Sequence, residues 1–242
     1  MTLPPAQSRP RSYNLEDQER MTRATNYFAW QAKLVTPELG QRVVEIGCGT
    51  GNFTGALLDR EAVIAVDVDA DCIDHLARRY RERENLHTVV ADAADLGAEQ
   101  LLSYRPDSCV CLNVLEHIED DRGALERIAS VLPSLGVIVL IVPAFEILYG
   151  PIDRNLRHCR RYSRDSIRKL AQASGVTIKK LHYMNFVGFF GWWLNAHVLH
   201  RDRQSEKQIE FFDRFIVPPS AHMEAIVAPP FGQSLFVVLE KP

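Results

Sequence analysis

A strand that runs directly into a glycine-rich loop constrains this chain more than any other feature. The run VVEI at residues 43–46 is apolar apart from Glu45, which favours a buried strand. The loop that follows lets the backbone turn with positive φ and lets a ligand approach main-chain atoms, because it holds Gly47, Gly49 and Gly51. Such a strand, loop and following helix are typical of α/β folds that bind nucleotides.

The spacing of these glycines separates two kinds of nucleotide ligand. A dinucleotide site requires G-x-G-x-x-G, whose third glycine packs the helix on the strand. The sixth position of that pattern is Asn52 here. Glu45 places a carboxylate where a pyrophosphate would be repelled and an ammonium group attracted. We therefore expect a ligand that carries an ammonium group; the alternative is that Glu45 only caps backbone donors.

The run from Glu45 to Gly51 resembles motif I of the class I S-adenosylmethionine (SAM) methyltransferases, E/D-x-G-x-G-x-G. The resemblance implies SAM as the cofactor, with the loop packed against its methionine part and Glu45 near its amino group. The cofactor contacts expected in this stretch are Glu45, Gly47, Cys48, Gly49, Gly51, Asn52 and Phe53.

The same resemblance assigns roles after the next two strands. Asp67, at the end of the second strand, would accept hydrogen bonds from the ribose hydroxyls, with Val68 beside the adenine. Asp92, after the third strand, would accept from the adenine amine, and Ala93 would offer its backbone N–H. The alternative for Asp92 is a solvated turn acid.

The run NVLEHI at 113–118 resembles the LEH signature of a methyltransferase group that includes ubiquinone-pathway O-methyltransferases. It implies that Asn113, Val114 and Leu115 line the cofactor. His117 would face the active site and assist deprotonation of the acceptor, because histidine titrates near neutrality. A structural histidine held in the turn is the alternative.

Apolar strands alternate with helical patterns along the chain, which predicts a parallel sheet covered on both faces. The order of these elements resembles that of the class I methyltransferases, which implies one α/β domain over 1–242 with their doubly wound, seven-stranded, Rossmann-like sheet, whose last strand inserts antiparallel between the fifth and sixth. Its expected parts are a tail and lid helices (1–40), a SAM-binding core (41–143) and two acceptor-side insertions (144–162 and 184–232).

The first insertion holds LYGPIDR at 148–154 and HCRRY at 158–162. Together with later motifs, these resemble a group of bacterial methyltransferases associated with glycan, lipid or natural-product gene sets. We expect His158 and Tyr162 to be catalytic, and Tyr149 and Arg161 to bind substrate. An arginine here suits a carboxylate or phosphate on the acceptor, whereas a solvated basic face is the alternative. Asp153 is expected to pair with an arginine.

The second insertion begins with the apolar run FVGFFGWWL at 186–194. Three interpretations remain open: a lid over an apolar acceptor, a homodimer contact, or a patch that touches lipid. Under the first, Trp193 and Asn195 shape the pocket while Trp192 packs in the core. Tyr27, in a predicted lid helix, is the other candidate substrate contact, with core packing as its alternative.

Composition narrows the partners. A net charge of −3, without a basic stripe, does not favour nucleic acid. Five cysteines form no CxxC pair, and Cys109 and Cys111 are too loosely arranged for zinc, so we predict no metal site and a reducing, cytoplasmic setting. No signal peptide and no apolar run long enough for a membrane span is recognised.

These observations predict a SAM-dependent methyltransferase acting on a small molecule, with oxygen as the acceptor atom. N-methylation is the second possibility and a carbon acceptor the third. A SAM-binding partner subunit without turnover is the rival from another class. A dinucleotide oxidoreductase is disfavoured by the missing third glycine.

Overall fold

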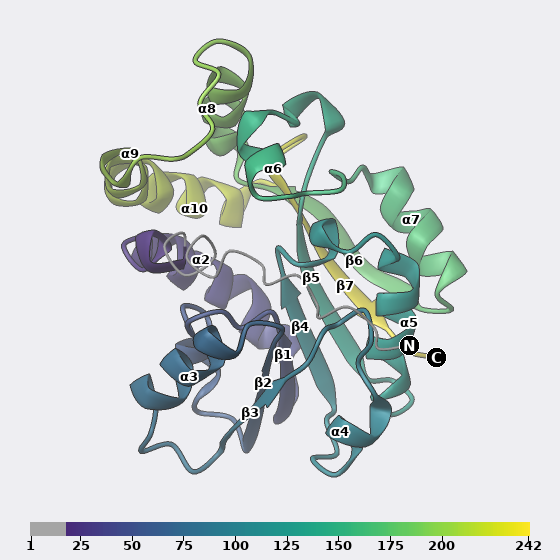
Figure 1. The fold of residues 1–242 in the computed structure, drawn as a ribbon. Coiled ribbons are helices and arrows are strands. Elements are labelled where there is room, and N and C mark those ends of the chain that lie inside the picture. Colours follow the sequence, from purple (N-terminus) through teal and green to yellow (C-terminus); the bar gives the residue numbers. More distant parts are fainter. Residues whose placement is uncertain (1–17) are drawn as a thin grey trace, which may run out of the picture.

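A seven-stranded sheet organises the computed structural model, which describes residues 18–242 (Figure 1). The strand order is β3-β2-β1-β4-β5-β7-β6, and β7 runs antiparallel between β5 and β6, as predicted. The other neighbouring pairs are parallel. The strands are β1 (Arg42–Ile46), β2 (Ala62–Asp67), β3 (Leu86–Val90), β4 (Ser108–Leu112), β5 (Val137–Pro143), β6 (Thr177–Met184) and β7 (Ser234–Glu240).

Helices cover both faces of this sheet and continue beyond one end of it (Figure 1). The α-helices are α2 (Thr25–Val35), α3 (Ala70–Arg79), α4 (Ala98–Leu102), α5 (Asp121–Ser130), α6 (Pro151–Asn155), α7 (Arg164–Ala173), α8 (Phe186–His197), α9 (Glu206–Phe211) and α10 (Val217–Ile226). The short helices are η1 (Thr36–Glu38), η2 (Thr54–Leu57), η3 (Leu115–His117), η4 (Glu146–Leu148) and the π-helical η5 (Phe212–Ile216).

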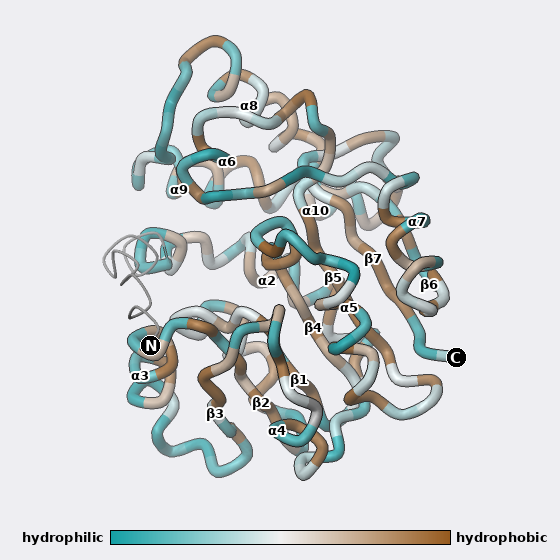
Figure 2. The backbone as a smooth tube through the Cα atoms, turned by 45° about the vertical axis from the view of Figure 1, so that its right-hand side comes forward, coloured by the Kyte–Doolittle hydropathy of each residue, from teal (hydrophilic) through white to brown (hydrophobic). Residues whose placement is uncertain are grey.

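The core lies on both sides of the central strands because their side chains alternate between the two faces. Val44 of β1 belongs to the cluster that includes α5 and α7, whereas Val43 belongs to the cluster that includes α2. The edge strands β3 and β6 are only partly buried, and Figure 2 shows hydrophobic colours along the inner strands. This two-sided burial explains the continuous apolar strands in the sequence.

The two insertions gather at one end of the sheet, where α6, α8, α9 and α10 lie together (Figure 1). The predicted tail (1–13) and the start of the lid helix at Leu15 lie outside the described residues. Within residues 18–242, no helix combines the length and apolar character needed to cross a membrane.

Candidate active site

A cavity of about 1640 Å³ opens at the carboxyl ends of β1, β2 and β4. One wall consists of the loops that follow these strands, and the opposite wall comes from α2 and the two insertions. Pockets for single small ligands commonly span roughly 300–1,000 Å³. The cavity therefore has room for a nucleotide-type cofactor and a second molecule.

The glycine loop forms part of the wall made by the loops after β1, β2 and β4, which we call the cofactor wall. Gly47 has φ +74°, and a Cβ on it would lie 2.2 Å from Cγ2 of Val114. Gly49 has φ +52°, and its N–H donates to Oδ2 of Asp67 at 2.8 Å. Cys48, Asn52 and Phe53 also line the cavity. The main chain is thus exposed to a ligand at positions that a side chain would obstruct, which fits SAM.

Gly51 and Leu115 differ from expectation. Gly51 turns toward α3, where a Cβ would meet Tyr80 at 3.0 Å and Leu76 at 3.1 Å, so its positive φ serves packing on that helix. The Leu115 side chain is fully buried among core residues. Neither is among the residues that line the cavity in the described part of the chain.

Glu45 lies at the junction of β1 and the loop and is buried on the cavity wall. Its Oε2 accepts a hydrogen bond from the Thr54 hydroxyl at 2.6 Å. Burial raises the pKa of this carboxyl to about 8, against the effect of Thr54, and the charge of Asp67 raises it further. A cationic group would reverse this shift by favouring the carboxylate.

The expected ribose and adenine contacts lie along the same wall. Asp67 accepts from the backbone N–H groups of Gly49 and Asp69, and burial raises its pKa in spite of these donors. Asp92 accepts from the N–H of Ala94 at 2.9 Å. The wall is completed by Val68, Ala93, Asn113 and Val114.

The opposite wall, made by α2 and the two insertions and here called the acceptor wall, contains most of the predicted substrate-side residues. His117, His158, Arg161, Tyr27 and Asn195 all line the cavity. Tyr27 lies on α2. The buried carboxylate of Asp213, in η5, accepts a hydrogen bond from the backbone N–H of Tyr27 at 2.8 Å, in the first turn of this helix. That contact fastens the lid helix to the second insertion.

Three predicted residues do not belong to this wall. Tyr162 packs in the core and donates to Asp121 Oδ2 at 2.9 Å, and burial raises its pKa, so it is not available to substrate. The Tyr149 hydroxyl donates to the backbone carbonyl of His158 at 2.8 Å and positions that residue. Trp193 is 42% exposed on the outer side of α8, whereas Trp192 lines the cavity, the reverse of the expectation.

Asp153 connects residues of the first insertion with one another and with α8. Its expected ion pair with an arginine is confirmed. Its Oδ1 accepts from Nδ1 of His158 at 2.9 Å and from Nε of Arg161 at 2.8 Å. Its Oδ2 accepts from the N–H of Gly150 and from Nε1 of Trp192. Burial acts to raise the pKa of Asp153, but these partners hold it below its usual value.

Arg161 is held within the protein instead of being presented to an acceptor anion. The residue is buried, and besides its bond to Asp153 it donates through Nη1 to the carbonyl of Ala144 at 3.1 Å. Its guanidinium also lies over the Trp192 ring, 5.0 Å from the ring centre. Its main contribution is therefore to shape the cavity wall.

His117 sits beside His158, with ring centres 4.7 Å apart in an edge-to-face arrangement. Partial desolvation at the cavity wall lowers the pKa of His117, although the residue stays exposed, and the neighbouring His158 lowers it further. The pKa of His117 is therefore lower than the near-neutral value expected for a histidine, and its ring is neutral at pH 7. Glu116, which precedes it, was not singled out, although it belongs to the LEH signature and also lines the cavity.

Known proteins show the same fold and family. Residues 13–181 match the model of a family described as a methyltransferase domain. The chain is 26% identical over 119 residues to a ubiquinone biosynthesis O-methyltransferase of Coxiella burnetii. The aligned stretch covers 49% of this chain and 46% of that protein. It is 39% identical over 77 residues to ribosomal RNA small subunit methyltransferase A of Burkholderia thailandensis, 30% of this chain and 28% of that protein.

The chain thus spans less than half the length of these curated relatives. Among solved structures, its fold resembles magnesium protoporphyrin IX methyltransferase of Synechocystis PCC 6803 with bound SAM. The TM-score is 0.53 at 15% identity, over 99% of this chain and 87% of that one. Since the family model spans most of the chain, the chain belongs to the methyltransferase domain family, and its fold resembles that of a methyltransferase solved with SAM bound.

Proposed function

We propose that this protein transfers a methyl group from SAM to an oxygen atom of a small-molecule acceptor. When bound, SAM supplies an electrophilic methyl group on a sulfonium. Such a donor needs little activation, so the protein's task is to align the acceptor with the methyl group and to exclude water. Membership of the methyltransferase domain family supports SAM as the donor, and the donor, the acceptor and the residue roles are all part of this proposal.

The observation that carries the proposal is the arrangement of two walls around one cavity. The acids at positions 45, 67 and 92 lie on one wall, and His117 and His158 lie on the wall formed with the first insertion. The turn of Asn113 and Val114 joins them, since it directly precedes η3. A cofactor on the first wall would therefore present its reactive end toward the histidines.

On the cofactor wall, we assign Glu45 to the amino group of SAM, Asp67 to the ribose and Asp92 to the adenine amine. A buried carboxylate next to an ammonium group satisfies both charges in a site of low polarity. The magnesium protoporphyrin IX methyltransferase that shares the fold has SAM bound, which supports the same cofactor here.

On the acceptor wall, His117 is the residue assigned to the acceptor hydroxyl. Its imidazole is neutral, so it can accept a hydrogen bond from an oxygen nucleophile and, less readily because its pKa is lowered, a proton. A protonated imidazolium at this position would do neither. The Coxiella relative is a ubiquinone biosynthesis O-methyltransferase, which agrees with oxygen as the acceptor atom.

An RNA acceptor is the main competing idea, since one relative is a ribosomal RNA methyltransferase. That similarity extends over only 30% of this chain. The residues that close the cavity include aromatic side chains of α2 and α8, and the chain carries a net charge of −3. A covered cavity in an acidic protein favours a small acceptor over a polyanion.

The cofactor assignment is tested by calorimetric titration with SAM, S-adenosylhomocysteine and NAD. We expect binding of the first two at one site per chain, and an affinity for SAM that falls by roughly tenfold or more in Asp92→Ala, because a charge-assisted hydrogen bond is lost. Asp95→Ala is the matched control, because Asp95 is exposed nearby and does not line the cavity. Binding of NAD but not SAM would refute the assignment.

A further inference from the structure

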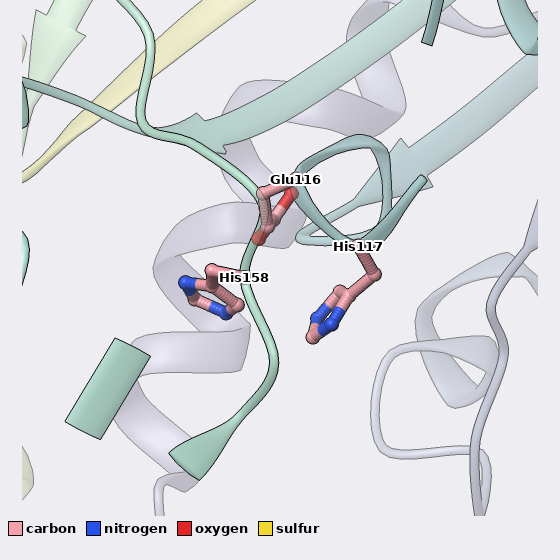
Figure 3. Close-up of side chains that lie close together, drawn as sticks. All are labelled: Glu116, His117 and His158. Atoms are coloured by element: carbon pink, nitrogen blue, oxygen red, sulfur yellow. The ribbon is translucent and has the colours of Figure 1, made fainter. Parts of the chain in front are cut away.

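Glu116, His117 and His158 form a cluster on the cavity wall. Each offers one ligand atom, and these three atoms lie within 4.8 Å of one another. Figure 3 shows Glu116 and His117 arising from the same turn and His158 arriving from a separate segment, with the three side chains directed toward a common space. A hydrogen bond from the N–H of Cys159 to the carbonyl of Glu116, at 2.6 Å, holds the two segments together.

The Glu116 carboxylate has no adequate partner in this cluster. The residue is 0% exposed, and within the described part of the chain neither Oε1 nor Oε2 has a hydrogen-bond partner. Burial raises its pKa to about 8, although its own backbone N–H and the charge of Arg161 act in the opposite direction. Buried carboxylates are almost always paired or bound to a metal, so a missing ligand explains these oxygens well.

Both histidine rings are already oriented through one nitrogen. Nδ1 of His158 is bonded to Oδ1 of Asp153 at 2.9 Å, and the His117 ring is hydrogen-bonded to the backbone of Leu156. Each ring therefore keeps its other nitrogen for a ligand. A carboxylate or backbone carbonyl on the far nitrogen is the usual support of a metal-binding histidine, because it fixes the tautomer and the ring plane.

We propose that Glu116, His117 and His158 bind a divalent transition-metal ion. Two imidazoles and one carboxylate are a donor set of catalytic zinc and non-haem iron sites, whereas magnesium and calcium prefer oxygen ligands alone. A bound cation would favour the ionised form of the Glu116 carboxyl, which otherwise has no hydrogen-bond partner among the described residues.

Such an ion would face the cavity, because all three ligands line it. Three protein ligands leave at least one position open. This inference rests on the proposed methyl transfer. The open coordination position would then be taken by the acceptor, which must carry a hydroxyl oxygen that can coordinate the ion. Coordination would lower the pKa of such a hydroxyl, so that it could lose its proton to water, and His117 would then hold the ion instead of accepting that proton.

Metal binding is measured on the full chain without any purification tag, independently of methyl transfer. The chain is stripped with a chelator, dialysed and titrated with Co²⁺ and with Zn²⁺, following the visible absorption of Co²⁺ and the heat of binding. We expect one ion per chain and a visible Co²⁺ absorption spectrum typical of an ion with few ligands. Mg²⁺ should bind far more weakly than Co²⁺ or Zn²⁺.

Variants of the three ligands and a control variant separate this site from adventitious binding. Glu116→Gln and His158→Ala should each weaken metal affinity by at least about tenfold. His75→Ala should bind as the wild type does, since His75 is an exposed histidine on α3 outside the cavity. Circular dichroism confirms that each variant is folded; should Glu116→Gln unfold, His158→Ala and His117→Ala decide the question.

The proposal is overturned if the wild type binds no Co²⁺ or Zn²⁺, or if the site variants bind as tightly as His75→Ala. Failure of SAM binding in the separate titration would refute the proposed function and leave this metal site standing. Conversely, SAM binding with no metal uptake would refute the site alone.

Discussion

Glu45 and Glu116 show how single residues prepare this cavity for charged ligands. Both are buried carboxyl groups on its wall, and burial raises the pKa of each to about 8. Each becomes an anion at pH 7 only when a positive partner arrives. The proposed partners are the ammonium group of SAM for Glu45 and a metal ion for Glu116.

The assignment of Glu45 predicts that SAM binding releases a proton. Below pH 8 the carboxyl is protonated in the free protein, and an ammonium group favours its ionised form. SAM affinity should therefore rise as pH increases from about 6 to 7.5, by at most about tenfold per pH unit. Calorimetry at pH 7 in buffers of different ionisation enthalpy should detect close to one proton released.

In Glu45→Gln the side chain cannot ionise, so the proton release should disappear and the affinity should become nearly independent of pH. Thr54, which bonds to Glu45, and Asp67, whose charge acts on it, are unchanged in this variant. Equal proton release by the wild type and Glu45→Gln would show that another group accounts for the linkage.

Residue types alone gave only part of the acceptor wall. The HCRRY motif located the right segment, but adjacent side chains in an extended segment point in opposite directions, so Arg161 faces the cavity and Tyr162 faces the core. Asp153 was recognised as an ion-pair partner, whereas its bond to Trp192 depends on a helix nearly 40 residues later. Such long-range partners cannot be read from local spacing.

At the scale of the element, the glycine loop and η3 meet at a contact that admits no side chain. Gly47→Ala would combine strain from a positive φ, about 1–2 kcal/mol, with a Cβ placed 2.2 Å from Val114. Overpacking of this kind costs roughly 1–3 kcal/mol more. We expect reduced stability in chemical denaturation and a loss of SAM affinity.

Gly175→Ala is the matched control for this contact. Gly175 follows the C-cap of α7 with φ +69°, yet a Cβ there would meet nothing within 4 Å. It should show the strain alone, with a smaller loss of stability and unchanged SAM binding. Equal effects of the two substitutions on SAM binding would mean that the approach of the loop to Val114 does not shape the site.

Helix α8 explains why Trp192 and Trp193 were assigned the wrong way round. The run is apolar on all sides, so its sequence contains no amphipathic pattern to indicate which face turns inward. In the structure Gly188, Gly191 and Trp192 line the cavity, while Phe190 and Trp193 are exposed. The lid interpretation accounts for the first face; dimer and lipid contacts stay hypotheses for the second.

For the whole molecule, the sheet was the most predictable feature. Strands that are buried on both faces must be apolar throughout, and their alternation with amphipathic helices leaves few possible topologies. The cofactor wall followed because its residues stand at the carboxyl ends of successive strands. The metal cluster did not, since Glu116 and His158 are far apart in sequence and meet only because the chain returns after β5.

The central claim is methyl transfer to a small molecule, and one measurement tests it directly. The protein is incubated with methyl-labelled SAM and a cell extract that has been separated into small-molecule, protein and RNA fractions. We predict label in the small-molecule fraction with the wild type and with His75→Ala, and little or none with Asp67→Ala. Label in the RNA or protein fraction would contradict the account, and so would the absence of methyl transfer by the wild type to any of the three fractions.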